Sequence, residues 1–361
     1  MPIKILIDPG SSISYGSFYI KGFRELYGRK NVKFSSAPFK RLEPVGNNLR
    51  FILAKNENLL KIYINTDDSY QIKMDIYNWC DIYGNVNANF EHYPKDKYPK
   101  QISLAPSFGI NIFNLSETIY YSLCNFLRSY RKVIETITYN KYSKKYHRSY
   151  FKNIKRYFLN YLKNYLYRLK LDEYYSMIEV KDNYIFFLST LWYNDEYNKN
   201  DEGVNKRRYD FIKACKEIKE IDFEGGFLVD DTSSSQLFSD IAMITEPVDI
   251  AVWINKTKQS MLVFNTPAFW GCHGWKLGEY LAMGKAIIST PLSNDLPAPL
   301  VHGEHIHIIK DYSIETIKEA ITYIMQNKEY RLNLQANAKK YWKEFCTPQS
   351  SLKLLSIVKS V

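Results

Sequence analysis

The chain has 361 residues, which is enough for two domains, and its hydrophobic content of 45% is normal for a folded soluble protein. Lysine and arginine number 49 against 38 acidic residues, and the net charge of +11 favours an anionic partner: phosphate, nucleic acid or an acidic membrane surface. The five cysteines are odd in number, scattered and without a Cys-x-x-Cys pair, which argues against a disulfide framework or a structural zinc site and favours a reducing cytoplasm.

The first half of the sequence alternates expected strands with short helices. Residues 4–7 form an apolar run that is too short for a signal peptide and predicts a buried strand, followed by a turn over 8–12 and a helix over 18–26. Further strands are expected at 32–34, 49–53, 60–64, 76–83 and 102–104. No window approaches about 18 consecutive apolar residues, so no membrane-spanning helix is expected. Strands separated by short helical patterns predict a parallel α/β sheet.

Residues 139–171 differ from the rest of the chain in composition. They contain ten Lys and Arg residues between Lys141 and Lys170 and no acid. Aromatic and aliphatic side chains recur at spacings of three and four from Tyr150 to Leu169, so they line one face of a helix. Two interpretations stay open: the helix packs this face on a core, or it lies on an anionic membrane. Nucleic acid is disfavoured, because no recognised binding motif accompanies the charge.

The second half repeats the alternation of strands and helices. Strands are expected at 184–188, 226–229, 260–264 and 286–289, and helices at 208–218, 314–325 and near the C-terminus. The predicted fold class is therefore α/β, with two Rossmann-like domains facing a cleft and a basic aromatic helical insertion in the N-terminal half. The expected domains are 1–178, containing the helical segment 139–171, and 179–340, with a helix in 341–361 that packs back on the first domain.

The segment 273–291, HGWKLGEYLAMGKAIISTP, is the most informative stretch. It follows a strand that ends near Phe264, and ligands of open parallel sheets bind outside the carboxyl ends of the strands. The helix expected there begins with Gly274, Trp275 and Lys276, and a helix N-terminus offers free N–H groups to phosphate. Lys276 adds a full charge, and the carboxylate of Glu279, one turn after Trp275, can accept hydrogen bonds from two sugar hydroxyls. This arrangement predicts a site for a diphosphate beside a ribose.

Residues 264–300 resemble the donor-binding core of GT-B glycosyltransferases of the large retaining group. In that group a strand ends in a Pro-Ser-like dipeptide, a glycine-rich acidic loop follows, and the next helix carries Glu-Ala-Met-Ala-x-Gly-(Lys/Arg)-Pro-Val-Ile. The counterparts here are Thr266-Pro267, residues 271–274, and residues 279–288. The resemblance implies a GT-B fold, a nucleotide-sugar donor bound by the second domain, and an acceptor bound by the first.

The family pattern has two glutamates, Glu-x7-Glu, and this sequence keeps one of them. The second matches Glu279, so the resemblance implies that Glu279 recognises the nucleotide ribose. The first falls at Gly271, which has no side chain, so recognition of the donor sugar does not carry over. His273 is the candidate substitute near the sugar or phosphate, since a histidine donates a hydrogen bond in either protonation state. Retention and inversion at the anomeric carbon both stay open.

The resemblance also implies a basic pair that grips the diphosphate. The first position of the pair, after a strand, holds Thr190 in place of a base, so Thr190 is expected to contact the nucleotide. The second position holds Lys206 and Arg208, either of which can supply the cation. Further residues at strand ends are expected to border the same pocket: Thr266, Ser289 and Thr290.

In GT-B enzymes the loop after the first strand reaches toward the donor. A glycine-serine turn occupies that place here, with Gly10, Ser11, Ser12 and Gly16. An inverting enzyme also needs a base that takes the proton of the acceptor hydroxyl. The candidate bases are Asp8, Asp67, Asp68 and Asp81, with Asp81 as the first choice.

No metal and no cofactor are expected. No Asp-x-Asp loop is present to hold a metal under a diphosphate, and His302, His305 and His307 have no carboxylate or cysteine cluster to complete a metal site. The predicted function is a metal-independent, hexosyltransferase-like transfer of sugar from a nucleotide sugar to a glycan or lipid-linked acceptor in surface polysaccharide biosynthesis. The expected location is cytoplasmic, peripheral on the inner membrane through 139–171. A nucleotide-sugar epimerase and a non-catalytic nucleotide or polyanion binder are the alternatives.

Overall fold

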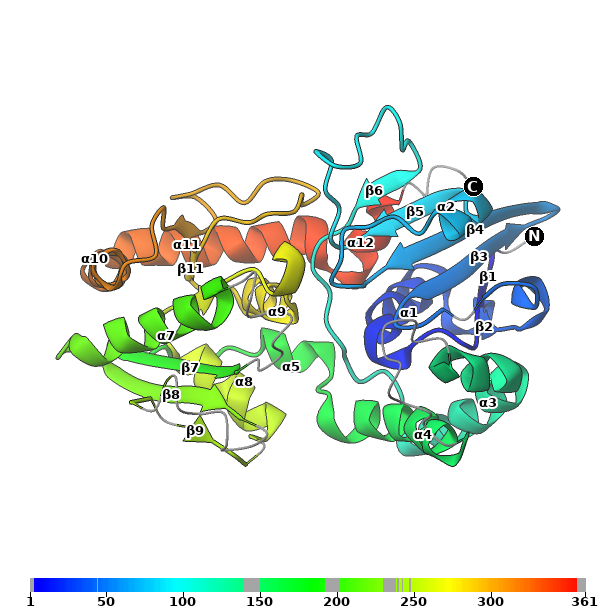
Figure 1. Cartoon of the computed structure of the whole chain (residues 1–361), viewed down its shortest axis with the longest axis horizontal. Coiled ribbons are helices and arrows are strands. Elements are labelled where there is room, and N and C mark those ends of the chain that lie inside the picture. The colour runs from blue at the N-terminus through cyan, green and yellow to red at the C-terminus, as the bar shows by residue number, and fades with distance from the viewer. Residues whose placement is uncertain are drawn as a thin grey trace. The chain divides into compact units, whose positions relative to one another are not determined.

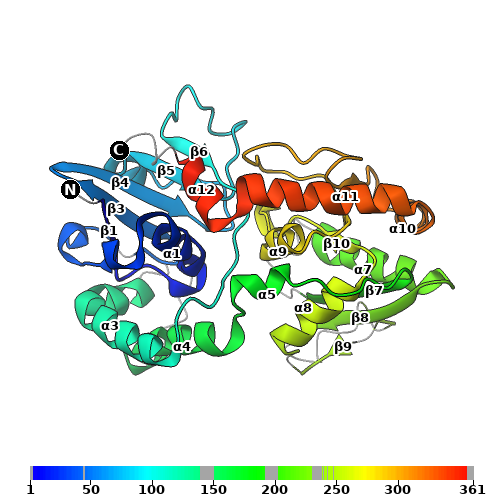
Figure 2. The ribbon, with the colours of Figure 1, turned by 180° about the vertical axis from the view of Figure 1, so that it is seen from behind.

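The computed structural model describes residues 3–43, 45–138, 150–191, 202–229, 238, 240–241, 243–246 and 248–355. The chain divides into two compact units, Met1–Leu171 with Phe345–Val361, and Asp172–Glu344. Both units combine sheets with helices, so the predicted α/β class is confirmed (Figures 1 and 2). In the ranges given above, no helix is long and apolar enough to cross a membrane.

The first unit is built on one six-stranded sheet. In spatial order its strands are β2 (Val32–Phe34), β1 (Lys4–Ile7), β3 (Leu49–Lys55), β4 (Asn58–Asn65), β5 (Ile82–Asn85) and β6 (Gln101–Ser103). β1 and β2 are parallel, as are β4, β5 and β6, but β3 is antiparallel to both of its neighbours. The expectation of a parallel sheet is therefore wrong at β3. The link between β3 and β4 is the two-residue turn Asn56-Glu57, which only antiparallel strands can use, and Asn56 takes the positive φ of 54° that such turns favour.

Residues 76–83, expected as one strand, divide between the helix α2 (Met74–Trp79) and β5. Tyr77 and Cys80 are buried against Tyr63 and Tyr83 of the sheet. The apolar run thus supplies one face of a helix and then a strand. Short apolar runs fit either period, which is why the sequence pattern alone misassigned this one.

The opposite face of the sheet is covered by α1 (Ile13–Tyr27) and α12 (Pro348–Leu354), which contact one another. The two helices approach closely at Gly22, where an added Cβ would lie 2.5 Å from the carbonyl oxygen of Pro348. Phe23 of α1 packs on Phe51 of β3, with 4.8 Å between the ring centroids. A helix from the end of the chain therefore completes the core of the first unit.

Two longer helices, α3 (Leu115–Thr138) and α4 (Tyr150–Tyr167), lie side by side in the first unit (Figures 1 and 2). The aromatic face of α4 turns toward α3: Phe126 contacts Phe158 with 5.1 Å between ring centroids, and the amide of Asn125 donates to the hydroxyl of Tyr161 at 3.1 Å. This face is therefore a packing surface, as one of the two interpretations of 139–171 has it. Residues 139–149 of that segment lie outside the described residues.

The second unit contains two three-stranded parallel sheets. Their strands are β7 (Tyr184–Thr190), β8 (Asp222–Leu228) and β9 (Met243–Ile244), and β10 (Val263–Asn265), β11 (Ile287–Ser289) and β12 (His307–Ile308). The sheets meet between β7 and β10, where the Met261 N–H donates to the carbonyl of Tyr184 at 2.7 Å. The helices are α5 (Leu171–Tyr175, of which the first residue belongs to the other unit), α7 (Glu202–Glu217), α8 (Ile250–Gln259), α9 (Trp275–Met283), α10 (Ile314–Gln326) and α11 (Lys328–Tyr341).

The core of the second unit joins β7, α7 and β10. The ring of Phe211 stacks on Phe264 at 4.3 Å between centroids and meets Phe187 edge-on at 5.1 Å. These contacts hold β7 and β10 beside the middle of α7. They therefore position the residues of the candidate site.

Candidate functional site

The segment 273–291 runs from a loop into α9 and then into β11. Gly274 is the N-cap of α9, and Gly284 ends the helix in a left-handed conformation with φ of 64° and ψ of 48°. The N–H of Gly284 donates to the carbonyls of Leu281 and Tyr280, which completes the C-terminal cap. The Met-Gly-Lys sequence is thus a helix stop before a buried strand.

A pocket opens at the N-terminal end of α9, beside the carboxyl ends of β7 and β10. It is lined by Phe187, Ser189, Thr190, Arg208, Phe264, Asn265, Thr266, Ala268, Gly274, Trp275 and Lys276. The structure thus brings together six residues predicted from the sequence: Thr190, Arg208, Thr266, Gly274, Trp275 and Lys276. Ser189 and Asn265 were missed, although each lies at the carboxyl end of its strand, which is the signal that points to them.

Two cations, Lys276 and Arg208, face this pocket. The ammonium of Lys276 donates to the carbonyl of Leu188 at 2.6 Å, and the guanidinium of Arg208 donates to the carbonyl of Thr190 at 3.0 Å. Burial, and to a smaller extent the positive charge of Arg208, lower the pKa of Lys276 from its ordinary value to about 7. A buried and a half-buried cation beside a helix N-terminus form a site that attracts an anion.

Lys206, Ser289 and Thr290 are outside the described lining of this pocket. The ammonium of Lys206 pairs with Asp210 one turn along α7, with 2.6 Å to its Oδ1 atom. Ser289 and Thr290 are fully buried, and the Ser289 hydroxyl donates to the carbonyl of Thr290 at 2.7 Å and accepts from the Asn265 amide at 2.9 Å. Of the two cations considered for α7, the described lining of the pocket includes Arg208 and not Lys206.

Glu279 is buried behind the pocket, with 5% of its surface exposed. Tyr174 of α5, also buried, has its hydroxyl 3.5 Å from Glu279 Oε1 and donates to it. The Glu279 carboxylate also acts on Lys276, because its negative charge raises the pKa of that ammonium. The three side chains therefore form one electrostatic group at the first turns of α9.

Gly271, where the family pattern has its first glutamate, lies in a loop shaped for glycine. Its φ is 72°, and an added Cβ would lie 2.7 Å from the Cβ of Ser293. The preceding residue, Trp270, also has a positive φ, of 52°. The loop therefore has no room for a glutamate at this position without a local rearrangement.

His273 lies between this loop and α9 and is 5% exposed. Burial lowers its pKa to about 4, while Asn294 and Asp295 act in the opposite direction. The imidazole is therefore neutral near neutral pH and can donate a hydrogen bond without carrying charge. That state suits recognition of a hydroxyl better than neutralisation of a phosphate.

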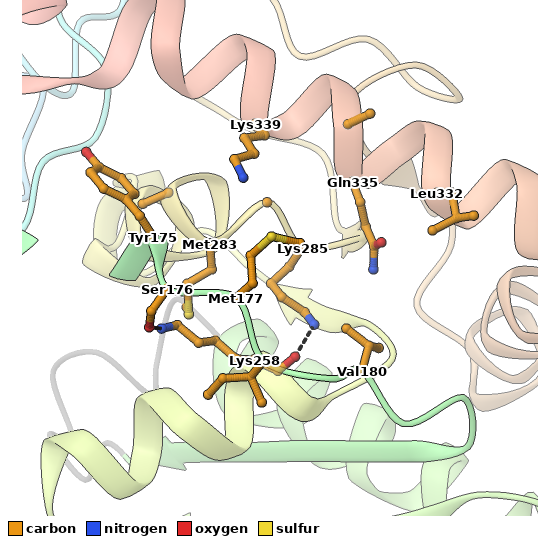
Figure 3. A pocket seen from close by; sticks show the side chains of 14 residues that line it. Tyr175, Ser176, Met177, Val180, Lys258, Met283, Lys285, Leu332, Gln335 and Lys339 are labelled. Atoms are coloured by element: carbon orange, nitrogen blue, oxygen red, sulfur yellow. Dashed lines mark hydrogen bonds between the residues drawn. The ribbon is translucent and has the colours of Figure 1, made fainter. Parts of the chain in front are cut away.

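A second pocket lies at the other end of α9, against α11 and residues 175–180 (Figure 3). The Lys285 ammonium donates to the carbonyl of Lys258 at 2.8 Å and also to that of Ser260, and Lys258 donates to the Ser176 hydroxyl at 2.6 Å. Both lysines are held by these hydrogen-bond acceptors, and the C-terminal end of a helix disfavours anions. The pocket at the N-terminal end of α9 is therefore the better candidate for binding a phosphate.

Each of the three clustered histidines has a structural partner. His302 Nδ1 accepts from the Ile308 N–H at 2.9 Å, His305 Nδ1 accepts from the Val301 N–H at 3.2 Å, and His307 Nδ1 lies 3.0 Å from the Tyr330 hydroxyl. Within the described part of the chain, no group of three or more His, Cys, Asp or Glu residues is placed to hold a metal ion.

The glycine-serine turn of the first unit lies between β1 and α1. Asp8 Oδ1 accepts from the Gly10 N–H at 2.9 Å, and Ser11 Oγ accepts from the Arg50 N–H at 3.2 Å. Ser12 is the N-cap of α1. Gly16 lies within α1, where an added Cβ would be 2.4 Å from Leu49 Cδ2, so it serves helix–sheet packing and not the loop.

The candidate bases of the first unit occupy different edges of the sheet. Asp8 follows the carboxyl end of β1 and forms a buried ion pair with Arg50 at 2.9 Å. Asp67 follows the carboxyl end of β4, on the same edge, and accepts from the amide of Asn48 at 3.1 Å. Asp81 precedes β5, on the opposite edge, and its carboxylate accepts from the Lys61 N–H at 2.8 Å. Asp67 therefore lies at the same edge of the sheet as the glycine-serine turn, and Asp81 lies at the opposite edge.

No protein-family model matches the sequence, and no curated protein does either. Similar solved structures include a glycosyltransferase from Rickettsia africae, at 12% identity over 81% of this chain and 68% of that one, with a TM-score of 0.40. Sucrose-phosphate synthase from Thermosynechococcus elongatus is 11% identical over 75% and 76%, with a TM-score of 0.38. A putative UDP-N-acetylglucosamine 2-epimerase from Listeria monocytogenes is 11% identical over 79% and 69%, with a TM-score of 0.33. At these scores the likeness is too slight to assign an activity.

Proposed function

We propose that the protein is a glycosyltransferase that moves a sugar from a nucleoside-diphosphate sugar to a hydroxyl of a glycan or lipid-linked acceptor, in surface polysaccharide biosynthesis. One observation carries the proposal: the N-terminus of α9, Lys276 and Arg208 meet in one pocket at the carboxyl ends of two parallel strands. Such a pocket suits a diphosphate, since the positive end of a helix dipole and two cations border it.

These groups act on the leaving group. During transfer the bond between the anomeric carbon and the diphosphate oxygen breaks, and its electron pair leaves with the diphosphate. Lys276 and Arg208 stabilise the charge that develops there, in a site where both are already held by carbonyl oxygens. Because the helix terminus and the two cations supply this stabilisation, the proposed reaction is independent of metal.

Glu279 is proposed to accept hydrogen bonds from the two ribose hydroxyls, with Tyr174 orienting its carboxylate. His273, neutral near neutral pH, is proposed to donate to the sugar in place of the missing first glutamate. The first unit binds the acceptor, and the acceptor oxygen forms the new bond to the anomeric carbon while a base takes its proton. For that base Asp67 is better placed than Asp81, because it shares an edge of the sheet with the turn at 8–12.

A transferase with a lipid-linked acceptor acts at a membrane surface. We therefore propose a cytoplasmic protein that is peripheral on the inner membrane through its first unit, where the basic helix α4 lies. The exposed bases Lys155, Arg156 and Lys163 of α4 support an anionic surface as a partner.

A non-catalytic nucleotide binder is the second candidate, and the geometry at Gly271 favours it. The loop has no place for the carboxylate that contacts the donor sugar in the family, so the protein can hold a nucleotide without activating a sugar. Turnover of a nucleotide sugar without an acceptor would instead point to an epimerase or a hydrolase.

The first test is a thermal-shift screen against UDP, GDP, CMP, dTDP and their common sugar conjugates, because a ligand that binds only the folded state raises Tm. A rise with one nucleoside diphosphate supports the proposal and identifies the base. No rise with any of them contradicts it.

Arg208 and Lys206 supply a matched pair of variants for the same screen. Both are cations of α7, but Arg208 lines the pocket and Lys206 pairs with Asp210. Arg208→Ala should weaken nucleotide binding by roughly tenfold or more, since a hydrogen bond to a charged group is lost, whereas Lys206→Ala should change it less than about twofold. Equal effects of the two variants would contradict the assignment of the pocket.

A further inference from the structure

The helix α3 turns small polar side chains inward and its leucines and Ile119 outward. Its buried face consists of Thr118, Ser122, Asn125 and Ser129, which are 0–7% exposed. Its outer face carries an apolar stripe, defined here as Leu115, Ile119, Leu123, Leu127 and Tyr130, which are 50%, 52%, 51%, 76% and 43% exposed. A helix at the surface of a water-soluble domain has the reverse pattern.

The polar side chains on the buried face of α3 are hydrogen-bonded, and its aromatic contact with α4 is made by Phe126. The hydroxyls of Thr118 and Ser122 donate to the carbonyls of Asn114 and Ile119 at 2.8 and 2.9 Å, within or just before the helix. Asn125 donates to Tyr161 of α4 at 3.1 Å. Small side chains on this face let α4 approach closely. The leucines of α3 are therefore not needed for its packing, and the stripe is available to contact another apolar surface.

The stripe runs along most of the described length of α3. Its members follow one another at spacings of four, four, four and three, so they lie along one side of the helix. From Leu115 to Tyr130 the helix rises about 22 Å, at ~1.5 Å per residue. Tyr120, 57% exposed, lies beside it, and on α4 Leu162 and Leu166 are 40% and 53% exposed.

The described charges on α3 and α4 are nearly all positive. Over the described side chains 115–130 and 154–170, Glu117 is the single acid, and it is paired with Arg29. Exposed cations in the same ranges are Arg128, Lys155, Arg156, Lys163 and Lys170. Apolar side chains with tyrosines at their margin and cations around them are typical of a helix that lies in the interface of an anionic bilayer.

We infer that the apolar stripe of α3 is a membrane-docking surface, which inserts into the headgroup region of an anionic lipid bilayer while the cations of α4 contact lipid phosphates. The aromatic face of α4, the element that the sequence singled out, packs inward against α3 and is not this surface. The inference deepens the membrane association suggested above, but it does not depend on transferase activity, because lipid binding can be measured without nucleotide.

The test is sedimentation of the full chain with vesicles of phosphatidylcholine alone or mixed with phosphatidylglycerol. The wild type should sediment with the anionic vesicles. The double variant Leu123→Ser/Leu127→Ser should bind them roughly tenfold more weakly, because two exposed leucines no longer transfer from water to lipid. The control is Leu59→Ser/Leu332→Ser, which replaces two leucines exposed by 55% and 51% outside the stripe and should bind like the wild type.

Three outcomes would overturn the inference: no binding of wild type to anionic vesicles, equal binding of the stripe variant, or an equal loss in the control. If the wild type forms a dimer that the stripe variant abolishes, and no variant differs on vesicles, the stripe is a contact between protein chains. Circular dichroism on each variant confirms that the fold is retained, as expected for changes at exposed positions.

A fluorescent probe gives a second, independent readout. Four of the five cysteines are buried and Cys124 is half-buried, so Leu127→Cys in a Cys124→Ser background accepts an environment-sensitive dye at the stripe. Its emission should shift to the blue on anionic vesicles and be quenched by spin-labelled lipid. The same dye at Leu59→Cys should show neither effect, and an unchanged emission at position 127 would contradict the inference.

Discussion

The protonation of Lys276 makes donor binding depend on pH. Burial and the neighbouring Arg208 lower its pKa to about 7, so about half of the free molecules carry a neutral amine at about pH 7. A bound diphosphate favours the ammonium and raises this pKa toward its ordinary value of 10.5. Binding therefore takes up about half a proton at about pH 7, and the dissociation constant should rise about fiftyfold between about pH 7 and about pH 9.

Titration calorimetry with the nucleoside diphosphate found in the thermal screen measures both quantities. Buffers of different ionisation enthalpy report the proton uptake, and a pH series reports the slope. Lys276→Met should bind weakly at all of these pH values and show little slope, while Lys206→Met should keep the slope of the wild type. A flat wild-type profile, or the same slope in Lys276→Met, would refute the role of Lys276.

Further substitutions test other parts of the site and fold. Glu279→Ala should raise the KM for the donor by roughly tenfold or more, through loss of a charged hydrogen-bond acceptor, and an unchanged KM would remove Glu279 from the site. Tyr174→Phe should raise it only about threefold and leave kcat unaltered, because the tyrosine acts through the carboxylate. Gly271→Ala should lower the free energy of unfolding by roughly 1–2 kcal/mol, because its φ is left-handed, and urea denaturation measures this. Gly22→Ala should cost about 1–3 kcal/mol in the same assay, since its Cβ would meet Pro348, and wild-type stability would contradict that close contact.

The structure of the segment 273–291 could be predicted from sequence because the residues that determine it are close together in the chain. Gly274 before an apolar helix and Gly284 after it mark the ends of α9, and the strand candidates on either side are the strands β10 and β11 of the structure. A helix start after a parallel strand identifies the edge where ligands bind. The site at the N-terminus of α9 was thus predicted from residues that are close together in the chain.

The structure of the first half of the chain was harder to predict, because the pairing of its strands depends on contacts between residues that are distant in the sequence. The antiparallel strand β3 and the helix α2 fall in short apolar runs whose periodicity fits more than one structure. The basic segment 139–171 stands out by its composition, whereas the leucines, serines and tyrosines of 115–130 form no distinctive sequence pattern. Only the packing of α4 against one side of α3 reveals that the leucines face outward.

The sequence by itself determined the α/β class, the ends of α9 and the chemistry available at its N-terminus, since periodicity, helix caps and strand ends are set by neighbouring residues. The tertiary structure decided which cation of α7 faces the pocket, which edge of the sheet carries Asp67, and which face of α3 stays exposed. Those outcomes depend on which side of an element its neighbours cover, and that is settled by contacts between residues far apart in the chain.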